Sequence, residues 1–246
     1  MPVSIPTPCI VDAHPPSAPN FSASRSPRYP SPESAGRKLA DLLAYYRRRP
    51  NSIVLALNPE SLPLATTVAG KLELKTNLML VRFLESHSGI TLGAVGQVVG
   101  REDEMILKEE IAKGIGLEGT ELEFHIADQR ATLRDMHSFY LTLIPSQSTP
   151  TQSHDSTILL LTNGIRRESE VRAALSILRR SNMVGRVIIA SPVVGIDCKL
   201  SILKEKGVEI VALVTPSARN LGTMVDWYER ASDFPPETYL PLLNLL

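Results

Sequence analysis

The stretch ILLLTNGIRRESEVRAAL, residues 158–175, changes its pattern twice. It opens with four aliphatic residues, Ile158 to Leu161, and a short run without polar alternation is typical of a strand buried on both faces of a parallel sheet. Turn residues follow at 162–164, and from Glu168 the apolar residues recur with the period of a helix. The stretch therefore predicts a strand, a loop and a helix, and in open α/β sheets ligands bind beyond the carboxyl ends of such strands.

The same alternation of apolar strands and amphipathic helices runs through most of the chain. Short apolar runs predict strands, and runs with a helical apolar stripe predict helices between them. Strands are expected at 53–57, 77–83, 92–99, 158–161, 186–191 and 209–214, and helices at 33–49, 62–72, 102–113, 120–140, from 168, and at 196–206. This order predicts an α/β fold with a doubly wound, mainly parallel sheet.

The composition is that of a globular protein without a bulk charge. The 246 residues are 43% hydrophobic and 21% charged, which suits one large domain or two small ones. Net charge is zero and aromatic residues are few, so we expect no nucleic-acid partner. No apolar run approaches the ~18 residues of a membrane span, so no membrane partner is expected either. Cys9 and Cys198 lie far apart, which predicts free thiols and a cytoplasmic location.

Residues 1–32 differ in composition from the rest of the chain. They hold nine of the nineteen prolines, six serines and only three charged residues. Such a segment buries too little apolar surface to offset the entropy of ordering it, so we predict that 1–32 is disordered and that 33–246 folds. Arg25 and Arg28 among the serines leave open an organelle transit peptide, although Asp12 and the lack of an amphipathic pattern argue against it.

The central stretch resembles the signature of type I phosphoribosyltransferases: four apolar residues, two acids, then a small-residue loop that ends Thr-Gly. The resemblance implies that the acids hold the ribose hydroxyls of phosphoribosyl pyrophosphate and that the loop amides hold its 5′-phosphate. Here Thr162 and Asn163 stand at the acid positions and Gly164 keeps the first loop glycine. Arg166-Arg167-Glu168 replaces the expected Ala-Thr-Gly. The frame of the motif matches and its anion-binding chemistry does not.

A second corner shows the same conflict. The family's Pro-Arg-Gly-Gly-Val-Pro-Val-Ala, whose backbone and arginine grip the pyrophosphate, is similar here to the segment that begins Asn58-Pro59-Glu60-Ser61. Pro59 takes the place of the arginine and has no amide to donate. Glu60 and Ser61 take the places of the paired glycines, and Glu60 would set a carboxylate against a pyrophosphate.

Three weaker matches extend the resemblance over about residues 29–240. YPSPESAGRKLADLL, residues 29–43, is similar to the family's entry helix, and the tail carries Trp227, Tyr228 and Phe234 near the family's aromatic positions, where we expect them to pack. Arg82 stands in a Val-Arg pair that the family also has, although an arginine at the end of a strand is more often simply solvated or salt-bridged. The resemblance implies a hood over the acceptor base at about 101–150.

We predict that any ligand binds in one crevice between the two motifs. We expect the carboxylate of Glu168 to oppose a phosphate there, while Arg166 and Arg167 either stay solvated or rebuild an anion site. The candidate crevice residues are Asn58, Pro59, Glu60, Ser61, Arg82, Thr162, Asn163, Gly164, Arg166, Arg167, Glu168 and Ser169. No catalytic residue is assigned.

Two functions stay open at this point. The first is a catalytically degenerate phosphoribosyltransferase-like binding or regulatory module without a cofactor, whose ligand would be a phosphorylated small molecule. The alternative is an active transferase that moves phosphoribose from phosphoribosyl pyrophosphate to a nucleobase-type acceptor with Mg²⁺. A hydrolase or reductase has no motif in its favour. His125 and His137 have no partners at metal spacing, so no metal site is expected. The oligomeric state, a homo-oligomer included, stays open.

Overall fold

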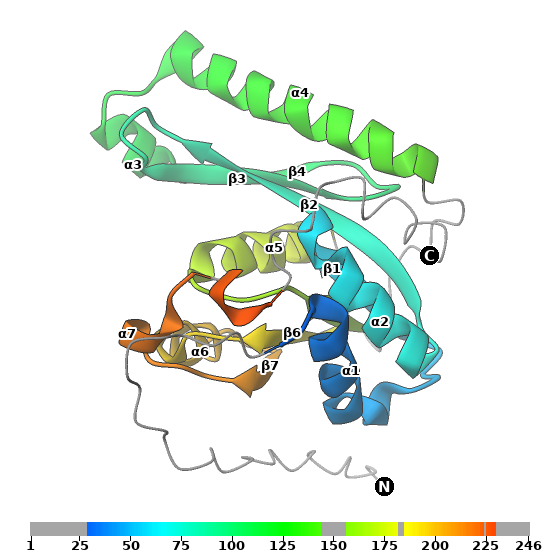
Figure 1. Cartoon of the computed structure of the whole chain (residues 1–246). Coiled ribbons are helices and arrows are strands. Elements are labelled where there is room, and N and C mark those ends of the chain that lie inside the picture. The colour runs from blue at the N-terminus through cyan, green and yellow to red at the C-terminus, as the bar shows by residue number, and fades with distance from the viewer. Residues whose placement is uncertain (1–28, 144–155, 182–184, 224, 230–246) are drawn as a thin grey trace, which may run out of the picture.

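The computed structural model describes residues 29–143, 156–181, 185–223 and 225–229. These residues form a seven-stranded sheet in the order β4-β3-β2-β1-β5-β6-β7 (Figure 1). The strands are β1 (Ser52–Leu57), β2 (Lys75–Glu85), β3 (Thr91–Val98), β4 (Glu104–Leu107), β5 (Thr157–Leu161), β6 (Arg186–Val193) and β7 (Val208–Val214). Pairing is parallel from β2 through β1, β5 and β6 to β7, and antiparallel between β2, β3 and β4. The predicted fold class is therefore confirmed.

Helices cover both faces of the parallel part of the sheet. The α-helices are α1 (Pro32–Leu42), α2 (Leu62–Leu72), α3 (Glu109–Gly114), α4 (Gly119–Leu143), α5 (Glu168–Arg180), α6 (Ile196–Ile202) and α7 (Ala218–Leu221), and short 3₁₀ turns lie at Ala44–Tyr46, Pro59–Ser61 and Val225–Trp227. Leu39 of α1 and Leu64 of α2 pack in the same core cluster as Val54 of β1. Leu175 of α5 packs in a second cluster with Leu55 of β1. Successive residues of β1 thus enter opposite cores, which explains why its sequence shows no polar alternation.

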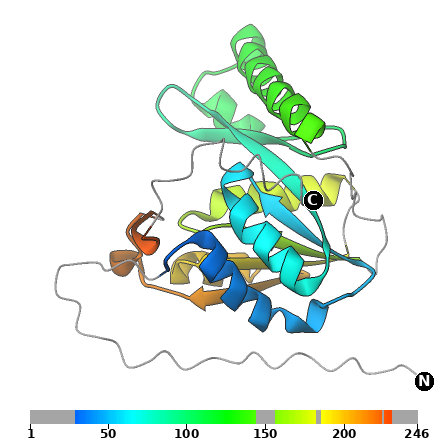
Figure 2. The same cartoon turned by 45° about the vertical axis from the view of Figure 1, so that its right-hand side comes forward.

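The antiparallel strands leave the core and build a hood (Figures 1 and 2). β2 pairs with β1 only as far as Met79 and then continues to Glu85, paired with β3. A third small core of Leu84, Leu92, Ala112 and Leu117 lies under α3 and the first half of α4. The hood predicted at about 101–150 thus also includes the outer part of the β2–β3 hairpin, and its last residues, 144–150, lie outside the described ranges.

The prediction of one helix over 102–113 was wrong. Residues 104–107 form β4, which pairs with β3, and only Glu109–Gly114 is helical. A Cβ atom at Gly93 of β3 would collide with the carbonyl oxygen of Ile106 in β4. The glycine therefore lets the two backbones approach, and this tertiary pairing overrides the local helical pattern of the sequence.

Several helices and strands end at other residues than the sequence predicted. The first helix stops at Leu42, far short of Arg49, and the 3₁₀ turn that follows buries Tyr46 while Leu42 itself is exposed. α6 stops at Ile202 and the chain reaches Gly207 through turns. β6 continues through Pro192 to Val193, past its predicted end at Ser191. β5 ends opposite Ala190, so the missing amide of the proline costs no bond between β5 and β6.

Residues 29–32 were predicted to be disordered, but the structure describes them as part of the domain. Tyr29 is buried, and its backbone is hydrogen-bonded to Trp227 and Glu229. Residues 1–28 lie outside the described ranges, as do Phe234 and most of the residues between α4 and β5. Trp227 and Tyr228 are buried, as expected. Within the described ranges, no helix has both the length and the apolarity that a membrane span requires.

Candidate functional site

The two motif segments lie against each other at the carboxyl ends of β1 and β5. These strands are adjacent and parallel, so the loops that follow them meet at one edge of the sheet. The side-chain amide of Asn58 donates to the carboxylate of Glu170 at 2.5 Å, and that of Asn163 donates to the backbone carbonyl of Glu60. The predicted crevice is thus bridged by the protein's own hydrogen bonds.

Asn58 organises its side of the crevice. Its backbone has φ 61° and ψ 159°, a conformation that is almost confined to glycine. Its amide N–H donates to the carbonyl of Met79 at 2.8 Å, and its Oδ1 accepts from the amide of Val81 at 2.9 Å. With the bond to Glu170, Asn58 joins β1, β2 and α5. The sequence placed Asn58 in the crevice without revealing this role.

The rest of this corner is a tight 3₁₀ turn. Pro59 opens the turn, and Ser61 closes it with an amide that donates to the carbonyl of Asn58 at 3.1 Å. The buried hydroxyl of Ser61 donates to the carbonyl of Leu57 at 2.6 Å. Pro59 has no N–H and the Ser61 amide and hydroxyl are engaged, so these residues offer little to a pyrophosphate.

Thr162 and Asn163, which stand at the two acid positions, make hydrogen bonds within the protein. Thr162 is buried, and its hydroxyl donates to the carbonyl of Gly164 at 3.4 Å. The carbonyl of Asn163 accepts from the hydroxyl of Tyr228 at 2.8 Å, a contact with the tail of the domain. The side-chain Oδ1 of Asn163 is buried with no hydrogen-bond partner in the described residues. Neither residue presents a carboxylate to a ribose or to a metal ion.

The loop after β5 runs alongside β6 instead of opening into a nest of amides. The amides of Thr162 and Ile165 donate to the carbonyls of Ala190 and Val193 at 3.2 and 2.8 Å. Ile165 also accepts from the amide of Gly195 at 3.0 Å. Two loop amides are therefore unavailable to a phosphate, because they already complete the pairing of this loop with β6.

The charged residues at 166–168 differ in their contacts. Glu168 was expected beside a bound phosphate, and instead its carboxylate lies 3.2 Å from the guanidinium of Arg172. A hydrogen bond from Ser201, and then the charge of Arg172, lower the pKa of Glu168. Arg166 and Arg167 are exposed, and within the described residues no hydrogen bond or ion pair engages their guanidinium groups. Ser169 is half-buried in the first turn of α5.

Arg82 makes its side-chain hydrogen bond to the hood. Its Nε donates to Oε1 of Gln129 in α4 at 3.3 Å, so it ties β2 to the hood helix. His137, farther along α4, accepts a hydrogen bond from the amide of Gly100 at 3.0 Å, and burial lowers the pKa of its imidazole. A neutral imidazole held as an acceptor in this way is a structural group.

Two carboxyl groups lie in the crevice where an anion would have to bind. Burial raises the pKa of Glu170, and the hydrogen bond from Asn58 partly offsets that rise. Glu60 is exposed to solvent on one side. The protein around its carboxyl nevertheless removes enough water to raise its pKa to about 7, and the charge of Glu170 contributes to this rise. Burial, and then the charge of Glu60, raise the pKa of Tyr140 near the end of α4. The hydrogen bonds from Asn58 to Glu170 and from Asn163 to the backbone of Glu60 hold this corner together.

No family model matches the chain. Among solved structures, it is similar to TT1426 from Thermus thermophilus, with 25% identity and a TM-score of 0.69 over 88% of this chain and 98% of the other. Adenine phosphoribosyltransferase from Trypanosoma brucei matches with 12% identity and a TM-score of 0.39 over 76% and 68% of the two chains. Hypoxanthine phosphoribosyltransferase from Staphylococcus aureus matches with 10% identity and a TM-score of 0.39 over 74% and 73%.

These likenesses concern the fold. The Thermus structure matches along nearly its whole length and over 88% of this chain, so most of this architecture recurs there. Phosphoribosyltransferases are among the structures that the chain matches. Their TM-scores lie below 0.5 and carry nothing about the chemistry of the crevice, which depends on the residues that line it.

Proposed function

We propose that this chain is a phosphoribosyltransferase-like protein that keeps the scaffold, lacks the transfer reaction, and acts as a binding or regulatory module in the cytoplasm. The observation that carries the proposal is the bridged crevice. Asn163, at the second acid position, binds the backbone of Glu60 through its side-chain amide, and Asn58 binds Glu170 through its own. A substrate in this crevice would have to break contacts that hold the domain together.

The charge distribution supports the same conclusion. A transferase of this kind needs negative charge at 162 and 163 to hold ribose and a hydrated metal ion, and needs amide and cationic groups at 59–61 for the pyrophosphate. This chain lacks that arrangement, because neutral side chains stand at 162 and 163 and an acidic side chain, with no cationic group beside it, stands at position 60 of the segment 59–61. Glu170 adds a second carboxyl on the other side of the crevice.

One observation favours the alternative, an active transferase with Mg²⁺. The exposed guanidinium groups of Arg166 and Arg167 stand beside the loop and could take up a phosphorylated small molecule. In the module that we propose, such a molecule would be a ligand held by these arginines and not a substrate. Mg²⁺ would be needed only if the transfer reaction survives.

The full chain with phosphoribosyl pyrophosphate, Mg²⁺ and purine, pyrimidine or nicotinate-type acceptors is expected to release no pyrophosphate above a protein-free blank. An active phosphoribosyltransferase in the same buffer checks the assay. Steady turnover that is lost in Thr162→Ala, but kept in Thr120→Ala at an exposed threonine of the hood, would overturn the proposal. The Thr120 variant separates a loss at the crevice from a general effect of a threonine substitution.

A further inference from the structure

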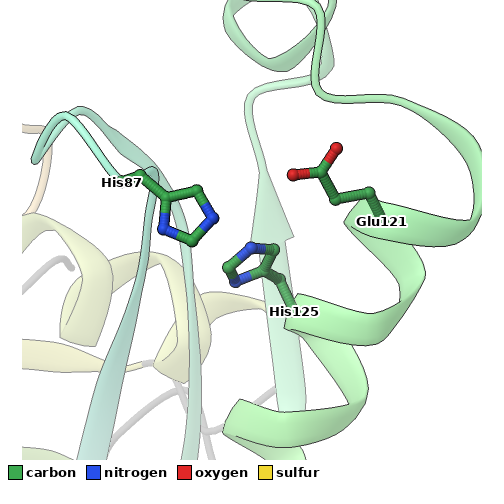
Figure 3. Close-up of side chains that lie close together, drawn as sticks. All are labelled: His87, Glu121 and His125. Atoms are coloured by element: carbon green, nitrogen blue, oxygen red, sulfur yellow. The ribbon is translucent and has the colours of Figure 1, made fainter.

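The hood brings together three metal-ligating side chains that lie far apart in the sequence. His87 comes from the turn after β2, and Glu121 and His125 come from the first two turns of α4 (Figure 3). One ligand atom of each residue, an imidazole nitrogen or a carboxylate oxygen, lies within 4.8 Å of the other two. The two imidazole rings lie edge to face, with centroids 5.3 Å apart and planes at 67°.

The local structure fixes all three positions. Glu121 and His125 are four residues apart on a helix, so they share one face. The turn that carries His87 is closed by hydrogen bonds, from the amide of Gly89 to the carbonyl of Ser86 at 2.8 Å and from the amide of Ile90 to the hydroxyl of Ser86 at 3.1 Å. The cluster thus sits on two ordered elements and not on a long loop.

The third small core holds α4 and the turn after β2 against each other. Leu122 and Ile126, which alternate with the cluster residues along α4, pack against the small core that contains Leu84 and Leu92 of the hairpin. The interior of the contact between α4 and the hairpin is therefore apolar, and the two histidines and the Glu121 carboxylate lie at its edge. This arrangement keeps His87 opposite His125 without any bond between the two side chains.

Two imidazole nitrogens and one carboxylate oxygen make the donor set of a zinc-class divalent ion. Mg²⁺ and Ca²⁺ prefer oxygen ligands alone, whereas imidazole suits Zn²⁺ and its transition-metal neighbours. Metal–ligand bonds of about 2.0–2.2 Å in a tetrahedron place ligand atoms about 3.4 Å apart. The side chains of His87 and Glu121 are exposed, and within the described residues no hydrogen bond or ion pair holds the three ligand groups, so small rotations can close the site.

We propose that His87, Glu121 and His125 bind a zinc-class divalent metal ion that clasps the hood helix α4 to the tip of the β2–β3 hairpin. Three protein ligands leave one coordination position for water or for an exogenous ligand. The sequence alone did not indicate this site, because His125 and His137 were considered together and His87 joins His125 only in the fold. His137 stays outside the site, since it accepts a hydrogen bond from Gly100.

The clasp would act on the hood and is independent of whether the crevice catalyses a reaction. From its middle onward, α4 is held by the hydrogen bond between Arg82 and Gln129 and by the burial of Leu133 and Tyr140. Its first two turns make no comparable polar contact with the described residues, and Phe124 there is 71% exposed. An ion at the cluster would therefore fasten the end of the hood helix that is farther from the crevice.

The test uses the full chain without a polyhistidine tag, stripped of metal with a chelator and titrated calorimetrically with Zn²⁺ and, separately, with Mg²⁺. We expect one Zn²⁺ per chain and no binding of Mg²⁺. Loss of an outer-shell partner alone weakens metal sites about 10–100-fold, so loss of a ligand in His87→Ala or His125→Ala should weaken Zn²⁺ binding at least as much. Glu121→Gln should weaken it too, whereas Glu123→Gln, an exposed glutamate about 200° around the same helix, should not.

A second measurement locates the ion independently of affinity. Zn²⁺ should slow backbone hydrogen exchange at 86–90 and 119–126 in the wild type and leave it unchanged in the double variant His87→Ala/His125→Ala. Thermal unfolding of each metal-free variant checks that it folds. Because His87 lies in an exposed turn, His87→Ala provides the test if His125→Ala does not fold. Absence of Zn²⁺ binding by the wild type would overturn the proposal, and so would unchanged Zn²⁺ binding by the folded double variant, which would place the ion elsewhere.

Discussion

At the scale of single residues, the crevice is shaped by Asn58. A non-glycine residue at φ 61° and ψ 159° costs about 1–3 kcal/mol, and persists only where other contacts offset the strain. Here those contacts are visible, because the side chain of Asn58 accepts from Val81 and donates to Glu170 while its backbone donates to Met79. Glycine could adopt this backbone freely but could make neither side-chain bond.

Substitution of Asn58 separates these two effects. Asn58→Ala loses both side-chain hydrogen bonds and keeps the strained backbone, so it should lower the free energy of unfolding by about 2–3 kcal/mol. Asn58→Gly loses the same bonds but relieves the strain, and should therefore be more stable than the alanine variant by about 1 kcal/mol or more. Urea unfolding of the three proteins measures both differences. Equal stability of the alanine and glycine variants would mean that this backbone is not strained.

At the scale of elements, the hood depends on how closely β4 approaches β3. The residues of β4, Glu104-Met-Ile-Leu, match a helix as well as a strand when taken alone. They form a strand because β3 offers Gly93 opposite Leu107, where the carbonyl of Ile106 leaves no room for a Cβ atom. The sequence pattern did not reveal Gly93 as a site of close backbone approach. A local pattern cannot reveal this pairing, since the partner that decides it lies in another element.

Gly93→Ala should destabilise the protein by about 3 kcal/mol, because the new Cβ meets a backbone carbonyl that cannot turn aside as a side chain can. Gly114→Ala is the matched control at the end of α3. A Cβ there would meet nothing within 4 Å, so we expect a neutral or slightly stabilising effect of up to about 1 kcal/mol. Denaturant unfolding of both variants against the wild type measures the difference. A Gly93 variant as stable as the control would contradict the close approach.

At the scale of the whole molecule, the sequence predicted the architecture better than the contacts within the crevice. Buried parallel strands have a recognisable composition, and the carboxyl ends of adjacent strands must meet, so the closeness of 58–61 to 162–169 followed from the strand pattern. The bonds that bridge the crevice did not follow, because Asn163 reaches Glu60 and Tyr228 reaches Asn163 across long stretches of chain. The hood cluster was missed for the same reason, since the fold alone brings His87 to His125.

The most direct test of the central claim, that the scaffold persists without its anion-binding chemistry, is calorimetric titration of the full chain with phosphoribosyl pyrophosphate, with and without Mg²⁺. The bridged crevice, the carboxyls of Glu60 and Glu170 and the neutral side chains at 162 and 163 predict no saturable heat in either titration. Saturable binding of one molecule per chain that Mg²⁺ strengthens and Thr162→Ala weakens would contradict the account.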